Sequence, residues 1–137
     1  MRHDHRCRLA ARDFHILQAM LAERSGRDDP LLPLLRQKLS SVTILPPHEV
    51  PPDLVTLYSR VRYRVNQRPP TTRVMIHDAA QGVIGATLPI THPRGLALLG
   101  FAEGVTVTVP DMAGMPETIS IEEVLYQPQA AGRAALA

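Results

Sequence analysis

Hydrophobic positions recur with a helical period in two stretches of the first third of the chain. The first stretch starts at Leu9 and stops at Ser25-Gly26, where glycine is the expected residue after a helix. The second starts at Asp29-Pro30, a capping residue followed by proline at the first helical position. The short polar loop between them predicts two helices that fold back as an antiparallel hairpin. Six apolar residues are expected to pack between its arms: Phe14, Leu17, Leu21, Leu31, Leu35 and Leu39.

Residues 45–54 (LPPHEVPPDL) interrupt this pattern. Proline lacks a backbone N–H and restricts the residue before it, so four prolines disfavour both a helix and a central strand here. We therefore predict a helical hairpin in residues 1–44, a stiff linker in residues 45–52 and a second domain in residues 53–137.

Apolar and polar residues alternate at the start of the second domain, as is typical of a half-buried strand. In residues 55–65 (VTLYSRVRYRV) the apolar side chains share one face, and Arg60, Arg62 and Arg64 lie on the other. This stretch is the first predicted strand.

A second strand is predicted at residues 72–77 (TRVMIH), with Val74 and Ile76 facing inward and Arg73 facing outward. In the last apolar stretch the period shifts near Glu122, which predicts a β-bulge there. Further strands are predicted at residues 84–90, 105–109 and 118–126.

One short apolar helix is predicted between two of these strands, in residues 92–104 (HPRGLALLGFAEG). Pro93 suits its first position and Gly100 its end, and the leucines between them cover its buried side. Together the elements predict an α+β fold, in which a strongly bent antiparallel sheet packs on one short helix and follows an N-terminal helical hairpin.

The composition excludes several classes of protein. The chain has 137 residues, 45% of them hydrophobic and 20% charged, as in a globular protein. A net charge of +2 is too small to drive nucleic-acid binding by itself. The single cysteine forms no internal disulfide, and neither a secretory leader nor an apolar run of roughly 20 residues is present. We expect a cytoplasmic protein without a membrane segment.

His3, His5 and Cys7 alternate near the start of the chain. These residue types bind zinc, but their spacing is not that of a zinc finger, and no second ligand pair follows. We expect an N-terminal tail here, with no metal and no cofactor.

Three motifs, in order along the chain, resemble one protein family. Residues 92–100, with Glu103-Gly104 after them, are similar to the Ser-Pro and A-L-L-G-K-x-x-G-D signature of the FKBP-like C-terminal domain of bacterial Gre transcript-cleavage factors. VTLYSRVRYR resembles VTMNSRVKF, and LYQPQAAG (residues 125–132) resembles ELEYQPEAAG, both from the Rnk family, the regulators of nucleoside diphosphate kinase. The resemblance covers nearly the whole chain.

This resemblance implies a non-enzymatic transcription regulator. Such a protein binds RNA polymerase near its secondary channel, competes with Gre-type factors and affects the level of nucleoside diphosphate kinase. The Gre factors dock through an Asp-Ser-Pro turn before the short helix. The matching residues are Thr91, His92 and Pro93, of which the proline is retained.

Asp28 and Asp29 lie at the predicted hairpin tip. Cleavage factors use acidic tip residues, spaced three apart, to help hold Mg²⁺ in the polymerase active centre. The two acids are adjacent here, and Asp29 before Pro30 is explained as a helix cap. We expect capping, and a cleavage factor acting through this tip stays as an alternative.

A further alternative is a prolyl isomerase, because the predicted core resembles FKBP. That activity uses an aromatic pocket, and the second domain offers Phe101 and three tyrosines.

The four arginines of the predicted basic face either bind an acidic surface or nucleic acid, or are simply solvated. Sparse aromatic residues argue against stacking of single-stranded nucleic acid, so we expect no sequence-specific nucleic-acid binding. We also expect a monomer. The basic face is Arg60, Arg62, Arg64 and Arg73.

Overall fold

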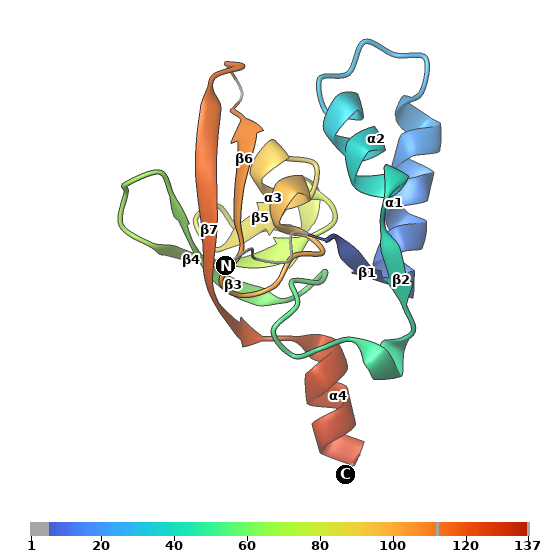
Figure 1. Cartoon of the computed structure of the whole chain (residues 1–137), viewed down its shortest axis with the longest axis vertical. Helices are drawn as coiled ribbons and strands as arrows, with labels where there is room; N and C mark the ends of the chain where they lie inside the picture. The colour runs from blue at the N-terminus through green and yellow to red at the C-terminus, as the bar shows by residue number, and fades with distance from the viewer. Residues whose placement is uncertain (1–5, 112, 137) are drawn as a thin grey trace.

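A helical hairpin stands beside a curled five-stranded sheet in the computed structural model, which describes residues 6–111 and 113–136 (Figure 1). The hairpin and first strands are β1 (Arg8–Ala10), α1 (Ala11–Arg24), α2 (Leu32–Ser40), β2 (Thr43–Leu45) and the 3-10 turn η1 (Pro47–Glu49). The remainder is β3 (Arg60–Val65), β4 (Thr71–Ile76), the 3-10 turn η2 (Ala79–Gln81), β5 (Thr87–Pro89), α3 (Pro93–Leu98), β6 (Thr106–Pro110), β7 (Pro116–Tyr126) and α4 (Pro128–Leu136).

The two helices pack against each other as predicted. Leu17 and Leu35 are fully buried, Leu31 is nearly so, and Phe14, Leu21 and Leu39 pack at the border of the same cluster. The start of α1 was predicted two residues too early. Leu9 and Ala10 belong instead to β1, which pairs in parallel with β2 and whose Arg8 N–H donates to the Gly100 carbonyl at 3.0 Å.

The large sheet has the strand order β5-β4-β3-β7-β6. β3 is antiparallel to β4 and to β7, and β6 is antiparallel to β7, whereas β5 is parallel to β4. The prediction of a wholly antiparallel sheet was therefore wrong at one edge. The chain crosses back through η2 after β4, so it enters β5 in the direction that β4 runs. The fold is α+β with a mixed sheet.

β3 is shorter than predicted because Tyr58 interrupts it. This residue has a left-handed φ of 68°, which turns the chain before Arg60, and Ser59 closes the turn by accepting the Thr56 N–H at 3.0 Å. The bulge near Glu122 is confirmed, since the β3–β7 register shifts between Arg62 and Tyr63 and leaves Glu122 without an opposite residue.

The facing of β4 differs from the prediction. Val74 lies opposite Arg60, and Arg73 lies opposite the buried Val61, so Arg73 is on the inner face. Met75, two residues on, is fully buried. Val74, Met75 and Ile76 are consecutive apolar residues, so alternation alone did not fix which of them points inward.

α3 packs against β5, β6 and β7 on one side and against α2 on the other. Leu96, Leu98 and Leu99 are fully buried, as predicted. α4 was not predicted; it follows β7 and points away from the sheet (Figure 1). Gln127 starts it, since its side-chain oxygen accepts the Ala130 N–H at 2.7 Å and its amide donates to the Pro51 carbonyl at 2.5 Å. No helix in the described ranges is long and apolar enough to cross a membrane.

One apolar core joins the hairpin to the sheet. Leu17, Met20 and Leu35 belong to the same buried cluster as Leu96 and Ile121. The proline-rich stretch between them contains the end of β2 and the turn η1, so it is more regular than predicted. Independent folding of residues 53–137 stays a prediction.

Replacement of Leu17 by alanine is expected to lower the free energy of unfolding by about 2–5 kcal/mol, because the side chain is fully buried and its loss leaves a cavity. Gln18→Ala, at an exposed position of the same helix, should change it by less than about 0.5 kcal/mol. Chemical denaturation of both variants measures the difference. Equal stability of the two would reject the packing of α1.

The fragment 53–137 is expected to fold but to melt below the full chain. Its five strands pair only with one another in the described part of the chain, whereas loss of the hairpin removes Leu17 and Leu35 from the buried cluster that they share with Leu96 and Leu98. Circular dichroism of the fragment tests this. A disordered spectrum would show that the hairpin is needed for the sheet to form.

Candidate functional site

The turn between β5 and α3 is built from close backbone contacts. The His92 N–H donates to the Pro89 carbonyl at 3.1 Å, and Thr91, His92 and Pro93 are each half-buried. Gly95 allows the helix to start directly against the end of β5, because a Cβ there would lie 2.1 Å from the Pro89 carbonyl oxygen. The turn therefore has little freedom to move.

His92 caps the first turn of α3. Its Nδ1 accepts the Arg94 N–H at 3.1 Å, and proline at the next position needs no such partner. Burial lowers the pKa of His92, and the Arg94 guanidinium lowers it further, while Glu117 partly offsets both effects. A neutral imidazole, with Nδ1 able to accept, is thus the form that this turn stabilises.

Arg94 is itself fixed by a two-point ion pair with Glu117, at the start of β7. The distances are 2.8 Å from Nε to Oε1 and 3.1 Å from the second guanidinium nitrogen to Oε2, and the Glu117 side chain is 5% exposed. Together with His92, Asp111 and Ala113, the pair borders a small hollow of about 270 Å³. The predicted docking turn is thus backed by a rigid polar cluster.

Sequence reasoning missed Arg94 and Glu117. A signal for one of them was present, because Glu117 falls on the same face of its strand as the buried Ile119 and Ile121. An acid in that phase requires a buried partner. Periodicity does not identify that partner, Arg94, which lies 23 residues away in the sequence.

At the hairpin tip, the two acids have different environments. Asp28 is exposed, whereas Asp29 accepts the Leu31 N–H at 2.9 Å and pairs with Arg24 at 2.5 Å. The Leu31 N–H, helped by Arg24, lowers the pKa of Asp29. α2 begins at Leu32 and Leu31 is its cap position, so the prediction that Asp29 is the N-cap and Pro30 the first helical residue was wrong; Asp29 closes the turn just before the helix. Within residues 6–111 and 113–136, no group of three histidine, cysteine or acidic side chains is placed to hold a metal ion.

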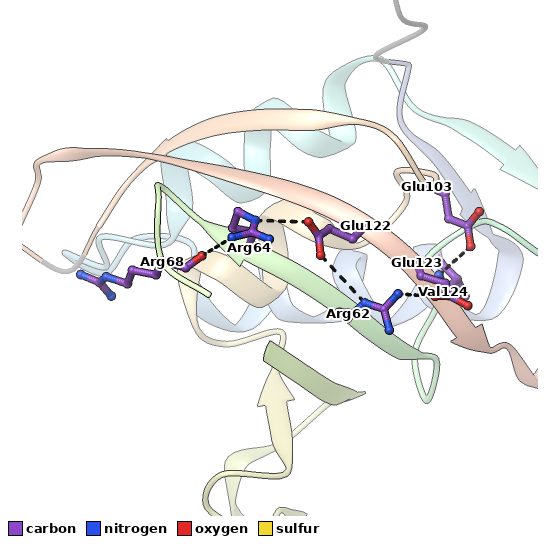
Figure 2. A network of polar contacts seen from close by, with 7 residues as sticks. All are labelled: Arg62, Arg64, Arg68, Glu103, Glu122, Glu123 and Val124. Carbon is purple, nitrogen blue, oxygen red and sulfur yellow. Dashed lines mark hydrogen bonds and ion pairs between the residues drawn. The ribbon is translucent and has the colours of Figure 1, made fainter. Parts of the chain in front are cut away.

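The predicted basic face is partly neutralised by acids of β7 (Figure 2). Arg62 pairs with Glu123 at 2.5 Å and approaches Glu122 at 3.9 Å, and Arg64 pairs with Glu122 at 3.2 Å. The bulge at Glu122 explains how two adjacent glutamates reach the same face. Such half-exposed pairs add little stability, but they remove much of the positive field.

The other two arginines of that predicted face lie apart from this network. Arg73, on the inner face, donates to the Gly85 carbonyl, which corrects its predicted position. Arg60 is exposed and lies opposite Tyr126 at the end of β7.

Two buried charged residues, also missed from the sequence, tie the hairpin to the rest of the molecule. The Lys38 ammonium of α2 donates to the Leu99 carbonyl at 2.5 Å and to the Ala97 carbonyl at 3.4 Å. Burial lowers the pKa of Lys38, and Cys7 partly opposes that shift. The Asp13 carboxylate of α1 accepts the Leu57 N–H at 3.0 Å, and burial raises the pKa of Asp13.

Cys7 does not belong to a tail. It is buried, its Sγ lies 3.6 Å from the Lys38 ammonium, and burial raises the pKa of its thiol. The expectation of a tail was wrong for this residue, because β1 draws it into the core. His3 and His5 lie outside the described residues.

Comparison with known proteins gives one consistent group. No family model matches the chain. The "Regulator of nucleoside diphosphate kinase" of Escherichia coli strain K12 and that of Shigella flexneri are each 30% identical to this chain over 104 residues, which is 75% of this chain and 76% of the relative. The solved structure of "Prokaryotic transcription elongation factor GreA/GreB from Nitrosomonas europaea" is also similar, with a TM-score of 0.69 and 28% identity, covering 88% of this chain and 100% of that one.

The stability of the chain is expected to fall with decreasing pH through His92. Because its pKa in the folded chain is lowered below the ordinary 6.5, the unfolded chain binds more protons below that pH, and protonation favours unfolding. His92→Asn keeps a side-chain acceptor but does not titrate. The melting temperature of the parent should therefore drop more than that of the variant between about pH 7 and pH 5. A constant difference between the two across that range would contradict the assignment.

Proposed function

This chain belongs to the family of the regulators of nucleoside diphosphate kinase, and we propose that it regulates transcription by binding RNA polymerase. The similarity to a transcription elongation factor extends over the whole of that factor's solved chain, so the proposal concerns the entire fold. The relatives' names and this structural likeness together support a transcription-associated regulator.

The observation that carries the proposal is the rigid turn Thr91–Pro93. By the resemblance of residues 91–93 to the Asp-Ser-Pro motif, we expect it to correspond to the docking turn of Gre-type factors. A surface fixed by Gly95 and by the Arg94–Glu117 pair loses little conformational entropy on binding. The turn is therefore suited to act as a docking surface. Thr91 and His92 stand at the positions that match Asp-Ser in the Gre motif.

Competition with Gre-type factors follows from a shared location. Two proteins that dock through the same turn of the same fold cannot occupy one site on the polymerase together. We propose that this site is near the secondary channel and that the effect on nucleoside diphosphate kinase is a consequence of altered transcription.

We propose a non-catalytic role for the protein because the hairpin tip is poorly suited to hold a metal ion. Both carboxylate oxygens of Asp29 are engaged, one by Leu31 and the other by Arg24. Asp28 is then the exposed acid of the tip, and a single carboxylate is a weak ligand for Mg²⁺. We expect the protein to act as a monomer, and no observation favours isomerase activity.

The double variant His92→Glu, Pro93→Ala is expected to weaken binding to core RNA polymerase at least tenfold. It removes a rigid apolar contact and adds a charge that must be desolvated. Binding is measured by pull-down and by competition against a Gre factor. The melting temperature of the variant is recorded in parallel, because His92 also caps α3.

Asp28→Ala is the matched control at the other candidate site, and it should leave polymerase binding nearly unchanged. Normal binding by the turn variant, combined with loss of binding by the tip variant, would reverse the assignment. The cleavage-factor alternative would then take its place, and a transcript-cleavage assay on paused complexes would test it.

A further inference from the structure

Three large apolar side chains are left mostly exposed to solvent. Among the described residues, Ile84 is fully exposed, Val83 is 68% exposed and Met115 is 64% exposed. The next large apolar side chain, Tyr126, is 52% exposed. Single exposed apolar residues are ordinary on protein surfaces, so exposure alone means little. The location of the three most exposed ones is informative, because they lie in the two loops beside the turn Thr91–Pro93.

The loop between β4 and β5 brings Val83 and Ile84 close to that turn. β5 has three residues, so at about 3.3 Å per residue its start and its end lie roughly 10 Å apart. The loop leads into the start of β5, and the turn follows its end, where the Ile90 N–H donates to the Ile76 carbonyl at 2.8 Å. The loop and the turn are therefore neighbours on the surface.

Internal contacts fix the end of this loop. The Val83 carbonyl accepts the Ala86 N–H at 3.0 Å, and Gly85 between them has a left-handed φ of 87°. Arg73 also donates to the Gly85 carbonyl. Ile84 thus stands at the corner of a closed turn, so its burial against a partner costs little backbone entropy.

Met115 approaches the turn from the opposite edge of the sheet. Asp111 and Ala113, in the connection between β6 and β7, border the small hollow beside His92. The Asp111 carboxylate accepts the N–H groups of Ala113 and Met115, each at 2.9 Å, so this connection is also closed on itself. α3 packs against both edge strands, β5 and β6. The turn at its start therefore lies between the loops of the two edges.

The charged side chains around the turn already have partners within the chain. Arg94 and Glu117 form their two-point ion pair, and backbone N–H groups occupy the Asp111 carboxylate. A charged partner surface would lose its water here without gaining a counter-charge, which is unfavourable. The area that the turn and its flanking loops offer to a partner is mainly apolar, because it consists of the proline of the turn and the exposed side chains of the loops.

We propose that Val83, Ile84 and Met115 extend the docking turn into one contact surface, which binds an apolar patch on RNA polymerase. This inference rests on the proposed function, because it concerns the partner of the same site. A standard interface buries roughly 800 Å² on each protein, so a partner that contacts Pro93 also covers loops at this distance.

Substitutions of Ile84 test the proposal in the full chain. Ile84→Ser is expected to weaken binding to core RNA polymerase at least about fivefold, whereas Ile84→Leu should bind like the parent. Ile84→Lys and Ile84→Glu should weaken binding to a similar degree, since an apolar patch offers a counter-charge to neither. All four variants should melt with the parent, because a fully exposed side chain adds little to the stability of the fold.

Leu125→Ser is the matched control and should bind like the parent. Leu125 is another exposed apolar side chain, but it lies near the end of β7 that leads into α4, away from the connection between β6 and β7 (Figure 1). Met115→Ser should weaken binding, and its combination with Ile84→Ser should weaken binding more than either change alone.

Four outcomes would overturn the inference. Normal binding by Ile84→Ser and Met115→Ser, together with loss of binding by the turn variant, would remove the flanking loops and retain the docking turn. Absence of polymerase binding by the parent would remove the proposed function, and this inference with it. Normal binding by only one of Ile84→Lys and Ile84→Glu would identify a charged partner surface. A concentration-dependent dimer of the parent that Ile84→Ser abolishes would identify a second copy as the occupant.

Discussion

The buried ammonium of Lys38 joins the two halves of the molecule at the C-terminal end of α3. The last carbonyls of a helix have no partners within the helix, and Lys38 supplies donors to two carbonyls there. A buried charge that lost these partners would be strongly destabilising. The hairpin is therefore held in one position relative to α3. The packing of α2 on α3, and with it the apolar core that the hairpin shares with the sheet, depends on this contact.

Gly100 makes that junction possible. Its φ of 88° suits glycine, and a Cβ there would lie 2.6 Å from the Cys7 Sγ. Its N–H donates to the Val55 carbonyl, and its own carbonyl accepts the Arg8 N–H. Three segments that are distant in sequence therefore converge on one residue, and a larger side chain there would push them apart.

The sequence alone predicted the parts of the fold that local periodicity controls. The helical hairpin, the helix from Pro93 and the bulge at Glu122 each leave a regular or interrupted apolar pattern. The facing of β4 was not predictable in this way, because three consecutive apolar residues fit either phase. The parallel pairing of β5 depends on where the chain crosses back, which periodicity does not record.

In the candidate site, too, only the features that a local motif marks could be predicted from the sequence. Its turn was located by resemblance to a family, and Pro93 is the one residue of the motif that is retained. The residues that hold the turn, Arg94 and Glu117, and the buried Lys38 and Asp13 have partners 23 to 61 residues away. A single sequence carries no record of such pairs, because a charged residue in an amphipathic helix is ordinarily on its exposed face.

The strand order has a consequence for synthesis of the protein on the ribosome. β7 follows β6 in the sequence but lies between β3 and β6 in the sheet. The hairpin helices are local and are available early, but a nascent chain cannot join β3 to β6 until residues 116–126 have emerged. The sheet therefore closes only after β7 has been synthesised. A premature stop within β7 removes an interior strand of the sheet, so the truncated product exposes unpaired edges on both sides of the gap.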